Sequence, residues 1–187
     1  MRIRPSAAVS AMLIALAAAA CGDAAREAPG AGTAADTAEA PMATAVVRDS
    51  AGRELGTLTL TSADSGITVQ GSLSGLPQSE YAMHLHTVGS CEPPSFESAG
   101  DHWNPTNAQH GSHADGGPHF GDLRNVTAGP DSVAPVRVIT AGGQLYNEPA
   151  LLDADGAAIV LHAGPDDYET QPAGNAGPPI ACGVVER

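Results

Sequence analysis

One stretch of 21 residues in this chain suits neither a helix nor a strand. Residues 102–122 read "HWNPTNAQHGSHADGGPHFGD" and hold four of the seven histidines. Pro105, Gly111 and Pro118 are among the residues that interrupt it too often for regular structure. A loop of this length inside a compact domain is usually functional or disordered. If the loop is ordered, a bound metal would explain it, because metal bonds to imidazole and carboxylate offset the entropy cost of ordering.

The rest of the chain carries short alternating segments. In "ITVQGSLS", apolar Ile67, Val69 and Leu73 alternate with polar residues, a period of two that is typical of a half-buried strand. Further strand candidates are "LGTLTLTS", "YAMHLHT", "AAIVLHA" and "ACGVV", and turn signals such as "SADSG" and "TAGPDS" separate them. No amphipathic helical stretch follows the N-terminal region. This pattern predicts an all-β fold, an antiparallel sandwich or barrel.

The N-terminal region predicts export. Arg2 and Arg4 precede an apolar run that ends in small residues at Cys21, as in a secretory signal peptide. Cys21 resembles the acceptor of a bacterial lipoprotein signal, although Ala18 stands where that signal prefers leucine. We therefore expect a signal peptide over 1–21, a flexible tether over 22–43 and one folded domain over 44–187. The protein is expected in the periplasm or cell envelope, with membrane contact only through a lipid on Cys21.

Charge and cysteine content limit the partners and the compartment. The formal net charge is −13 and the chain has no lysine, which excludes nucleic acid as a plausible partner. Two cysteines remain after Cys21, namely Cys91 and Cys182. In an exported chain such a pair predicts a disulfide.

The histidines outside the loop also form a pattern. If "YAMHLH" is a strand, Met83 and Leu85 face the core, and His84 and His86 lie side by side on the other face. His162 ends the apolar strand "IVLH" in the same way. An all-nitrogen set of this kind suits copper. The loop adds candidate ligands that could make a set of three nitrogens and one carboxylate, which suits structural zinc; they are His102, His110, His113, His119, Asp115 and Asp122. Spacing alone predicts a divalent metal and nothing finer.

Specific motifs resemble a known family, the copper/zinc superoxide dismutases of the secreted bacterial type. The resemblance covers 44–187 and is carried by "HLH", "GSCEP", "GDHWNP", "QHG", "PHFGDL", "VLHAGPDDY" and "GNAG..IACGVV". It implies a Greek-key β-sandwich or barrel of about eight strands with long metal-binding loops, and the cofactors copper and zinc.

The resemblance also implies a role for each site residue. His102 would be shared between both metals, and Asp166 would orient one ligand of each metal, His84 and His110. The copper ligands implied are His84, His86, His102 and His162, and the zinc ligands are His102, His110, His119 and Asp122. Cys91 and Cys182 match the family disulfide, whereas His113 matches no ligand position.

The sequence departs from the family pattern just before the C-terminal strand candidate "ACGVV". The family carries an arginine that holds the incoming anion at the position of Pro179, and a threonine at the position of Ala173. Proline offers neither charge nor an N–H donor. Arg124, next to "GDL", is the candidate for a compensating charge.

The expected function is dismutation of superoxide to dioxygen and hydrogen peroxide, slowed by the missing arginine. The alternative is a non-catalytic copper and zinc binding or storage protein on the same fold. The oligomeric state stays open.

Overall fold

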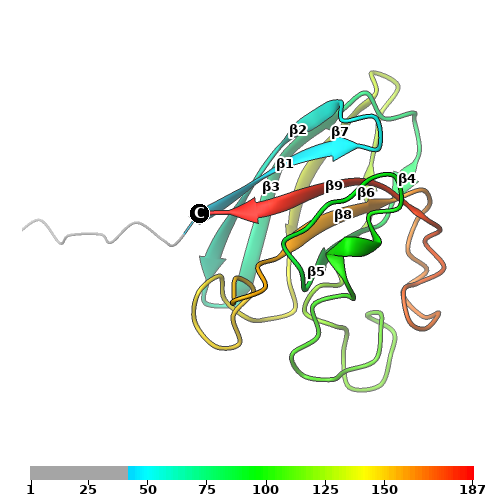
Figure 1. The fold of residues 1–187 in the computed structure, drawn as a ribbon. Coiled ribbons are helices and arrows are strands. Elements are labelled where there is room, and N and C mark those ends of the chain that lie inside the picture. Colours follow the sequence, from blue (N-terminus) through cyan, green and yellow to red (C-terminus); the bar gives the residue numbers. More distant parts are fainter. Residues whose placement is uncertain (1–41) are drawn as a thin grey trace, which may run out of the picture. The chain divides into compact units, whose positions relative to one another are not determined.

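The computed structural model describes residues 42–187, which build a curled antiparallel sheet (Figure 1). The expected signal peptide, the lipidation site Cys21 and nearly all of the expected tether lie outside the described residues. The first strand begins at Met42, and Ala43 is already buried in the core. Among residues 42–187, no helix has the length and apolar character needed to cross a bilayer.

Seven strands form the main sheet, in the order β5-β8-β9-β1-β2-β3-β7, and β4 pairs with β6 in a separate ribbon. All pairs are antiparallel. β9 lies beside β1, as in a Greek key, and the all-β prediction is confirmed. The strands are β1 (Met42–Asp49), β2 (Glu54–Ala63), β3 (Gly66–Ser74), β4 (Glu80–Tyr81), β5 (Met83–His86), β6 (Val126–Thr127), β7 (Val133–Ile139), β8 (Ala158–His162) and β9 (Pro179–Glu186).

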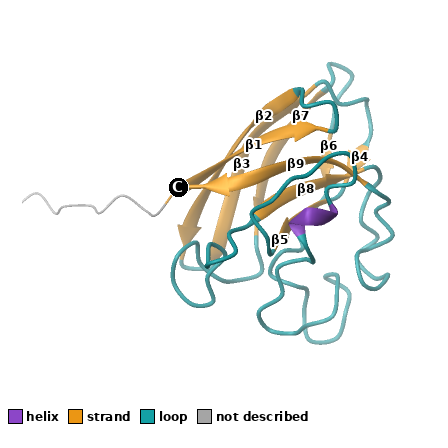
Figure 2. Ribbon diagram, viewed as in Figure 1, coloured by secondary structure: helices purple, strands orange, loops and turns teal. Residues whose placement is uncertain are grey.

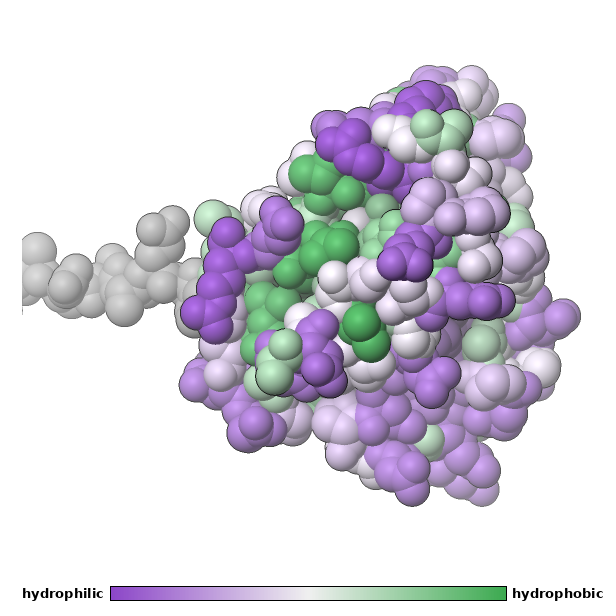
Figure 3. Space-filling model, viewed as in Figure 1, coloured by the Kyte–Doolittle hydropathy of each residue, from purple (hydrophilic) through white to green (hydrophobic). Residues whose placement is uncertain are grey.

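Alternation along the strands places the core inside the curl of the sheet. Leu58 and Leu60 of β2 and Ile67, Val69 and Leu73 of β3 are fully buried, and threonines and serines between them are more exposed. These are the residues that the period of two predicted. Hydrophobic side chains gather over the strands in Figure 3, whereas the end of the molecule that carries the long loops is mostly hydrophilic.

Two of the longer strands, β1 and β7, were not predicted because their sequences are less regular. β1 contains small alanines at its buried positions, and β7 contains Pro135. Proline cannot donate a ladder hydrogen bond, so it is confined to edge strands. β7 is an edge of the seven-stranded sheet, which explains why Pro135 is tolerated.

A covalent bond ties the loop after β5 to the last strand. Cys91 forms a disulfide with Cys182 of β9, as predicted. The one helical turn of the described residues, a 3₁₀-helix over Glu97–Ala99, lies in the same loop (Figure 2). Phe96 and Ala99 pack with Cys182 in a small second core on the sheet. The loop segment that precedes His102 is therefore fixed to the sheet.

Candidate metal centre

Two neighbouring strands carry three buried histidines. His84 and His86 lie on β5 and His162 ends β8, which is the partner of β5. His84 is 0 % exposed, and the ring centroids of His84 and His162 are 4.9 Å apart. Met83 and Leu85 face the core, as predicted. The histidine face of β5 is buried as well, because the long loop covers it.

The loop reaches the strand through backbone hydrogen bonds. The Leu85 N–H donates to the Gly121 carbonyl over 2.9 Å, and the Trp103 N–H donates to the Leu85 carbonyl over 2.8 Å. A side chain at Gly121 would overlap the Leu85 carbonyl oxygen, so only glycine allows this approach. The pairing brings His102 beside His86 and Asp122 beside His84. The His102 and His84 ring centroids are 4.1 Å apart.

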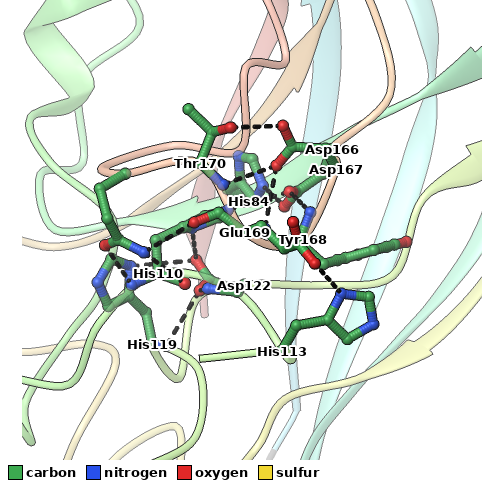
Figure 4. A network of polar contacts seen from close by, with 12 residues as sticks. His84, His110, His113, His119, Asp122, Asp166, Asp167, Tyr168, Glu169 and Thr170 are labelled. Carbon is green, nitrogen blue, oxygen red and sulfur yellow. Dashed lines mark hydrogen bonds and ion pairs between the residues drawn. The ribbon is translucent and has the colours of Figure 1, made fainter. Parts of the chain in front are cut away.

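Asp122 is the centre of a second group of side chains from the long loop, which we call the loop-borne group (Figure 4). Its Oδ1 lies 2.9 Å from His102 Nδ1, 3.0 Å from His110 Nδ1 and 3.1 Å from His119 Nδ1. Its Oδ2 accepts backbone hydrogen bonds from Gly111 and His119. One carboxylate thus gathers three imidazoles from positions far apart in the loop.

The candidate ligands fall into two groups that share one residue. The strand-borne group consists of His84, His86, His102 and His162. The loop-borne group consists of His102, His110, His119 and Asp122. Within each group the candidate ligand atoms lie within 4.8 Å of one another. His102 belongs to both. The structure therefore brings together all seven residues that the resemblance implied as ligands.

Hydrogen bonds select which ring nitrogen is left for a ligand. His86 Nδ1 lies 2.7 Å from the Gly100 carbonyl and His162 Nδ1 lies 3.0 Å from the Gly177 carbonyl. A carbonyl can only accept, so each Nδ1 carries the proton and each Nε2 keeps a free lone pair. His84 is reversed, because its Nε2 lies 2.9 Å from Asp166 Oδ2 and Nδ1 is left free.

The free nitrogens have no other partner among the described residues. His84 Nδ1, His86 Nε2 and His162 Nε2 are buried and make no hydrogen bond. His110 Nδ1 is also buried and lies 3.0 Å from Asp122 Oδ1. Buried polar atoms are normally paired, so unpaired atoms that converge point to a missing ligand. Neutral imidazole nitrogens are ligands for copper and zinc, and the set with a carboxylate matches a closed zinc site. The residues present therefore fit both metals.

Burial keeps the strand-borne imidazoles neutral. It lowers the pKa of His84 to about 3 and the pKa of His86 to about 3. In the loop-borne group, neighbouring charges also shift the pKa values. Burial alone would lower the pKa of His110, but Asp122 and Asp166 raise it to about 9. Burial would also raise the pKa of Asp122, yet hydrogen bonds from His102 and His110 hold it well below its usual range.

Asp166 joins the two groups. Its Oδ2 contacts His84, and its Oδ1 lies 3.0 Å from His110 Nε2. Burial would raise the pKa of Asp166, but the hydrogen bonds with His110 and His84 keep it well below the usual value. The carboxylate is itself held by the Tyr168 N–H over 2.7 Å. A side chain at Gly174 would overlap both Asp166 and His110, and Gly174 has a φ of 66° that favours glycine.

Several positioning residues were not found from the sequence. Asn125 accepts from the Asp166 N–H and donates to its carbonyl, each over 2.9 Å. Gln171 accepts from the His110 N–H over 2.8 Å and donates to its carbonyl over 2.9 Å. The carbonyls of Gly100 and Gly177 were missed too. Backbone carbonyls leave no signal in the sequence, and neither Asn125 nor Gln171 belongs to a pattern that marks it as a partner of the histidine loop.

Comparison with known proteins identifies the family. Residues 54–185 match the family model described as copper/zinc superoxide dismutase. A copper/zinc superoxide dismutase of Caulobacter vibrioides is 41 % identical over 152 residues, covering 77 % of this chain and 85 % of the relative. Another from Aquifex aeolicus is 40 % identical over 138 residues, covering 72 % and 82 %. The chain belongs to the copper/zinc superoxide dismutase family.

One similar solved structure is described as dismutase-like and not as a dismutase. It is a double mutant of a superoxide dismutase-like protein from Bacillus subtilis. This chain is 35 % identical to it, covers 97 % of it with 77 % of its own length, and superposes with a TM-score of 0.73. Members of the copper/zinc superoxide dismutase family use copper and zinc, and the two ligand groups of this chain provide for both.

Pro179, where the resemblance implies an arginine, is the first residue of β9 and lies opposite His162. The structure does not place Arg124 among the residues around the strand-borne histidines. The strand-borne group opens into a hollow of about 790 Å³, and no arginine lines it. Arg124 lines a separate hollow with Tyr168 and Ile139.

His113 and Asp115 lie outside both ligand groups, like the other exposed residues of the loop tip. Figure 4 shows His113 near Tyr168 and away from His110 and His119. Its Nδ1 lies 3.5 Å from Glu169 in an exposed ion pair. Its side chain is 59 % exposed, as expected for a solvated histidine of the loop.

Proposed function

We propose that this protein dismutates superoxide at a copper ion in the strand-borne group, with zinc in the loop-borne group and His102 shared between the two. The observation that carries the proposal is the place of His102 in both groups. Its Nδ1 is directed at Asp122 of the loop group, which leaves Nε2 for the strand group. A protein that merely stores metal has no need of such sharing.

Bound copper would alternate between two oxidation states, taking an electron from one superoxide to give dioxygen and passing it, with two protons, to a second to give hydrogen peroxide. The chain contributes orientation. Asp166 and the carbonyls of Gly100 and Gly177 hold three imidazoles in the tautomers described above. Partners of this kind fix ring orientation and raise ligand basicity.

His102 is the candidate proton carrier. Its Nδ1 stays directed at Asp122, so a proton can be held or released only at Nε2. His102 lines the hollow with His86 and His162, where a small molecule can reach it. A proton taken up at Nε2 in one half of the cycle is therefore available to the substrate in the other.

The activity is expected to be slower than in family members that keep the arginine. Pro179 has no charge to attract superoxide, and none of the arginines lines the hollow. A guanidinium supplies both a steering charge and a bidentate docking group, and proline supplies neither.

Metal analysis combined with superoxide consumption tests the proposal on the full chain. We expect copper and zinc near one equivalent each and measurable turnover. His102→Gln should remove most of the turnover, because it removes the shared imidazole. The matched control is His113→Gln, an exposed histidine of the same loop that should leave turnover unchanged. Full metal content without turnover would reject dismutation.

That result would support the second candidate, a copper and zinc binding or storage protein. Pro179 favours it, because the residue that docks the anion is replaced. The similarity to a protein described as superoxide dismutase-like favours it as well. Metal release measured with a competing chelator would then characterise the protein better than any rate of superoxide loss.

We also propose that the protein acts outside the cytoplasm, in the periplasm or cell envelope, and that Cys21 carries a lipid. The N-terminal sequence pattern and the disulfide between Cys91 and Cys182 support export, since disulfides persist in oxidising compartments. Mass spectrometry of the protein recovered from membranes tests the lipid. An unmodified cysteine, or a mature chain that starts elsewhere, would reject it.

A further inference from the structure

The hollow beside the strand-borne group contains unpaired buried nitrogens. His86 and His162 line it, and they are 7 % and 5 % exposed. Their Nε2 atoms make no hydrogen bond with the described residues. The hollow is therefore the route by which a ligand of these nitrogens arrives from solvent.

The charged side chains on the wall of this hollow, apart from the histidines, are all acidic. They are Asp101, Glu148 and Asp153, and all three are exposed. None of them takes part in an ion pair among the described residues. Asp101 precedes His102, whereas the other two belong to the loop between β7 and β8. Two loops far apart in sequence thus place three uncompensated carboxylates around one opening.

The arginines of the described residues lie elsewhere. Arg48 pairs with Glu54 and Arg53 pairs with Asp49, in both cases over 2.9 Å. Arg187 stacks over Tyr146. Arg124 lines the other hollow, and Arg137 does not line this one either. Nothing on the wall offsets the three negative charges.

Charges of one sign around an opening act on the rate at which ions enter. A cleft lined by like charges raises the local concentration of ions of the opposite sign and changes association rates about 10- to 1000-fold. The effect is strongest at low ionic strength, because the screening length shortens from about 30 Å at 0.01 M to about 3 Å at 1 M salt. An opening of this kind admits cations readily and repels anions.

We propose that Asp101, Glu148 and Asp153 make this hollow a cation-selective entrance, which speeds the capture of copper ions by the strand-borne histidines and slows the entry of small anions. The inference deepens the proposed function and rests on it in one respect, the assignment of copper to this group. It makes the three carboxylates determinants of specificity, acting on entry and not on the chemical step.

Copper capture can be followed without any superoxide. Trp103 is the single tryptophan of the chain and lines the same hollow, so copper that arrives there should quench its fluorescence. The full chain, stripped of copper and loaded with zinc, is mixed with Cu²⁺ in a stopped-flow instrument. At low salt we expect the wall variant, Asp101→Asn/Glu148→Gln/Asp153→Asn, to bind copper about tenfold more slowly. The difference should nearly disappear near 1 M salt.

A matched control removes the same number of charges elsewhere. Asp64, Glu80 and Glu97 are exposed, line none of the hollows described here and form no ion pair among the described residues. Asp64→Asn/Glu80→Gln/Glu97→Gln should capture copper nearly as fast as the unchanged protein. Equal rates for all three proteins, or equal slowing by both triple variants, would overturn the proposal.

The second arm uses an anion. Azide is titrated into the copper-loaded proteins and its binding is followed by absorbance. The wall variant should bind azide several-fold more tightly at low salt, and the control should not. Equal azide affinity in the two variants would overturn the anion half of the proposal. Neither arm measures turnover, so an inactive protein that keeps both charge effects would reject dismutation and leave the entrance intact.

Discussion

The two groups of candidate ligands are built differently. The strand-borne group uses His84, His86 and His162 on paired strands, and backbone carbonyls hold two of them. The loop-borne group is collected around one carboxylate, Asp122, whose side chain is 3 % exposed. The first group is positioned by the sheet and stays neutral, whereas the second depends on charge. A strand can preorganise imidazoles by register alone, but a glycine-rich loop needs a central charged group to hold it.

The largest expected difference comes from removing that centre. Asp122→Ala deletes the contacts to three imidazoles and two backbone N–H groups. Breaking such a buried network costs about 3–5 kcal/mol of unfolding free energy. Urea unfolding of the metal-loaded protein measures the cost, and limited proteolysis should cut the loop. Asp115→Ala, an exposed carboxylate of the same loop, should change stability by less than about 0.5 kcal/mol. Similar losses in both variants would refute the central role of Asp122.

In the metal-stripped protein, the two groups should affect the pH dependence of the unfolding free energy in different ways. The pKa of His84 and of His86 is about 3 in the fold against about 6.5 unfolded. Between these values the unfolded chain binds protons that the fold rejects, so stability falls as pH decreases from about 6.5 towards 3. The lowered pKa values of Asp122 and Asp166 act in the same direction below about pH 4.

His110 should behave in the opposite way. Its pKa is raised to about 9, so its stabilising effect is complete below about pH 6.5 and is lost as pH rises through 9. Urea midpoints measured from pH 4 to 10 should therefore pass through a maximum. His110→Gln should flatten the alkaline side and leave the acid side sloping. A steep alkaline decline that persists in this variant would contradict the assignment.

A smaller effect is expected where the two groups meet. Asp166→Asn keeps the shape of the side chain and weakens its hold on His84 and His110 together. Loss of such a partner typically lowers metal affinity about 10- to 100-fold. Competition with chelators should show this loss for both copper and zinc. The neighbouring exposed residue gives the control, Asp167→Asn, which should retain both affinities; a loss for one metal alone would show that Asp166 does not couple the groups.

The smallest expected effect is on the rate at which superoxide reaches the strand-borne group. Pro179→Arg adds a cation at the start of β9, opposite His162. Superoxide consumption at low salt should rise several-fold, and the gain should shrink as salt screens the added charge. Pro178→Arg, one residue earlier, is the positional control. Equal gains from both substitutions would mean that only net charge matters.

Periodic features of the molecule were predictable from the sequence, whereas features made by the meeting of distant loops were not. His84, His86 and the apolar face of β5 could be placed by alternation, and the disulfide by the cysteine pair. The ligand roles came from the family resemblance, because spacing alone cannot select His119 over His113. The wall residues Glu148 and Asp153 could not be predicted, since they reach the hollow through the course of a loop that has no periodic pattern.

The position of Arg124 was unpredictable for the same reason. In a strand, neighbours point to opposite faces by rule, but in an irregular loop the direction of each side chain depends on local backbone angles. Arg124 is two residues from the candidate ligand Asp122, yet the hollow that it lines contains none of the strand-borne histidines. Nearness in sequence was therefore no guide to nearness to the histidines.

The bond between Cys91 and Cys182 also has a consequence for metal binding at His86. It anchors the segment whose Gly100 carbonyl fixes the tautomer of His86. Without the disulfide that anchor would be lost, and the His86 ring would be free to present either nitrogen to a ligand. Reducing the bond should therefore weaken copper binding at His86 even though no ligand is removed.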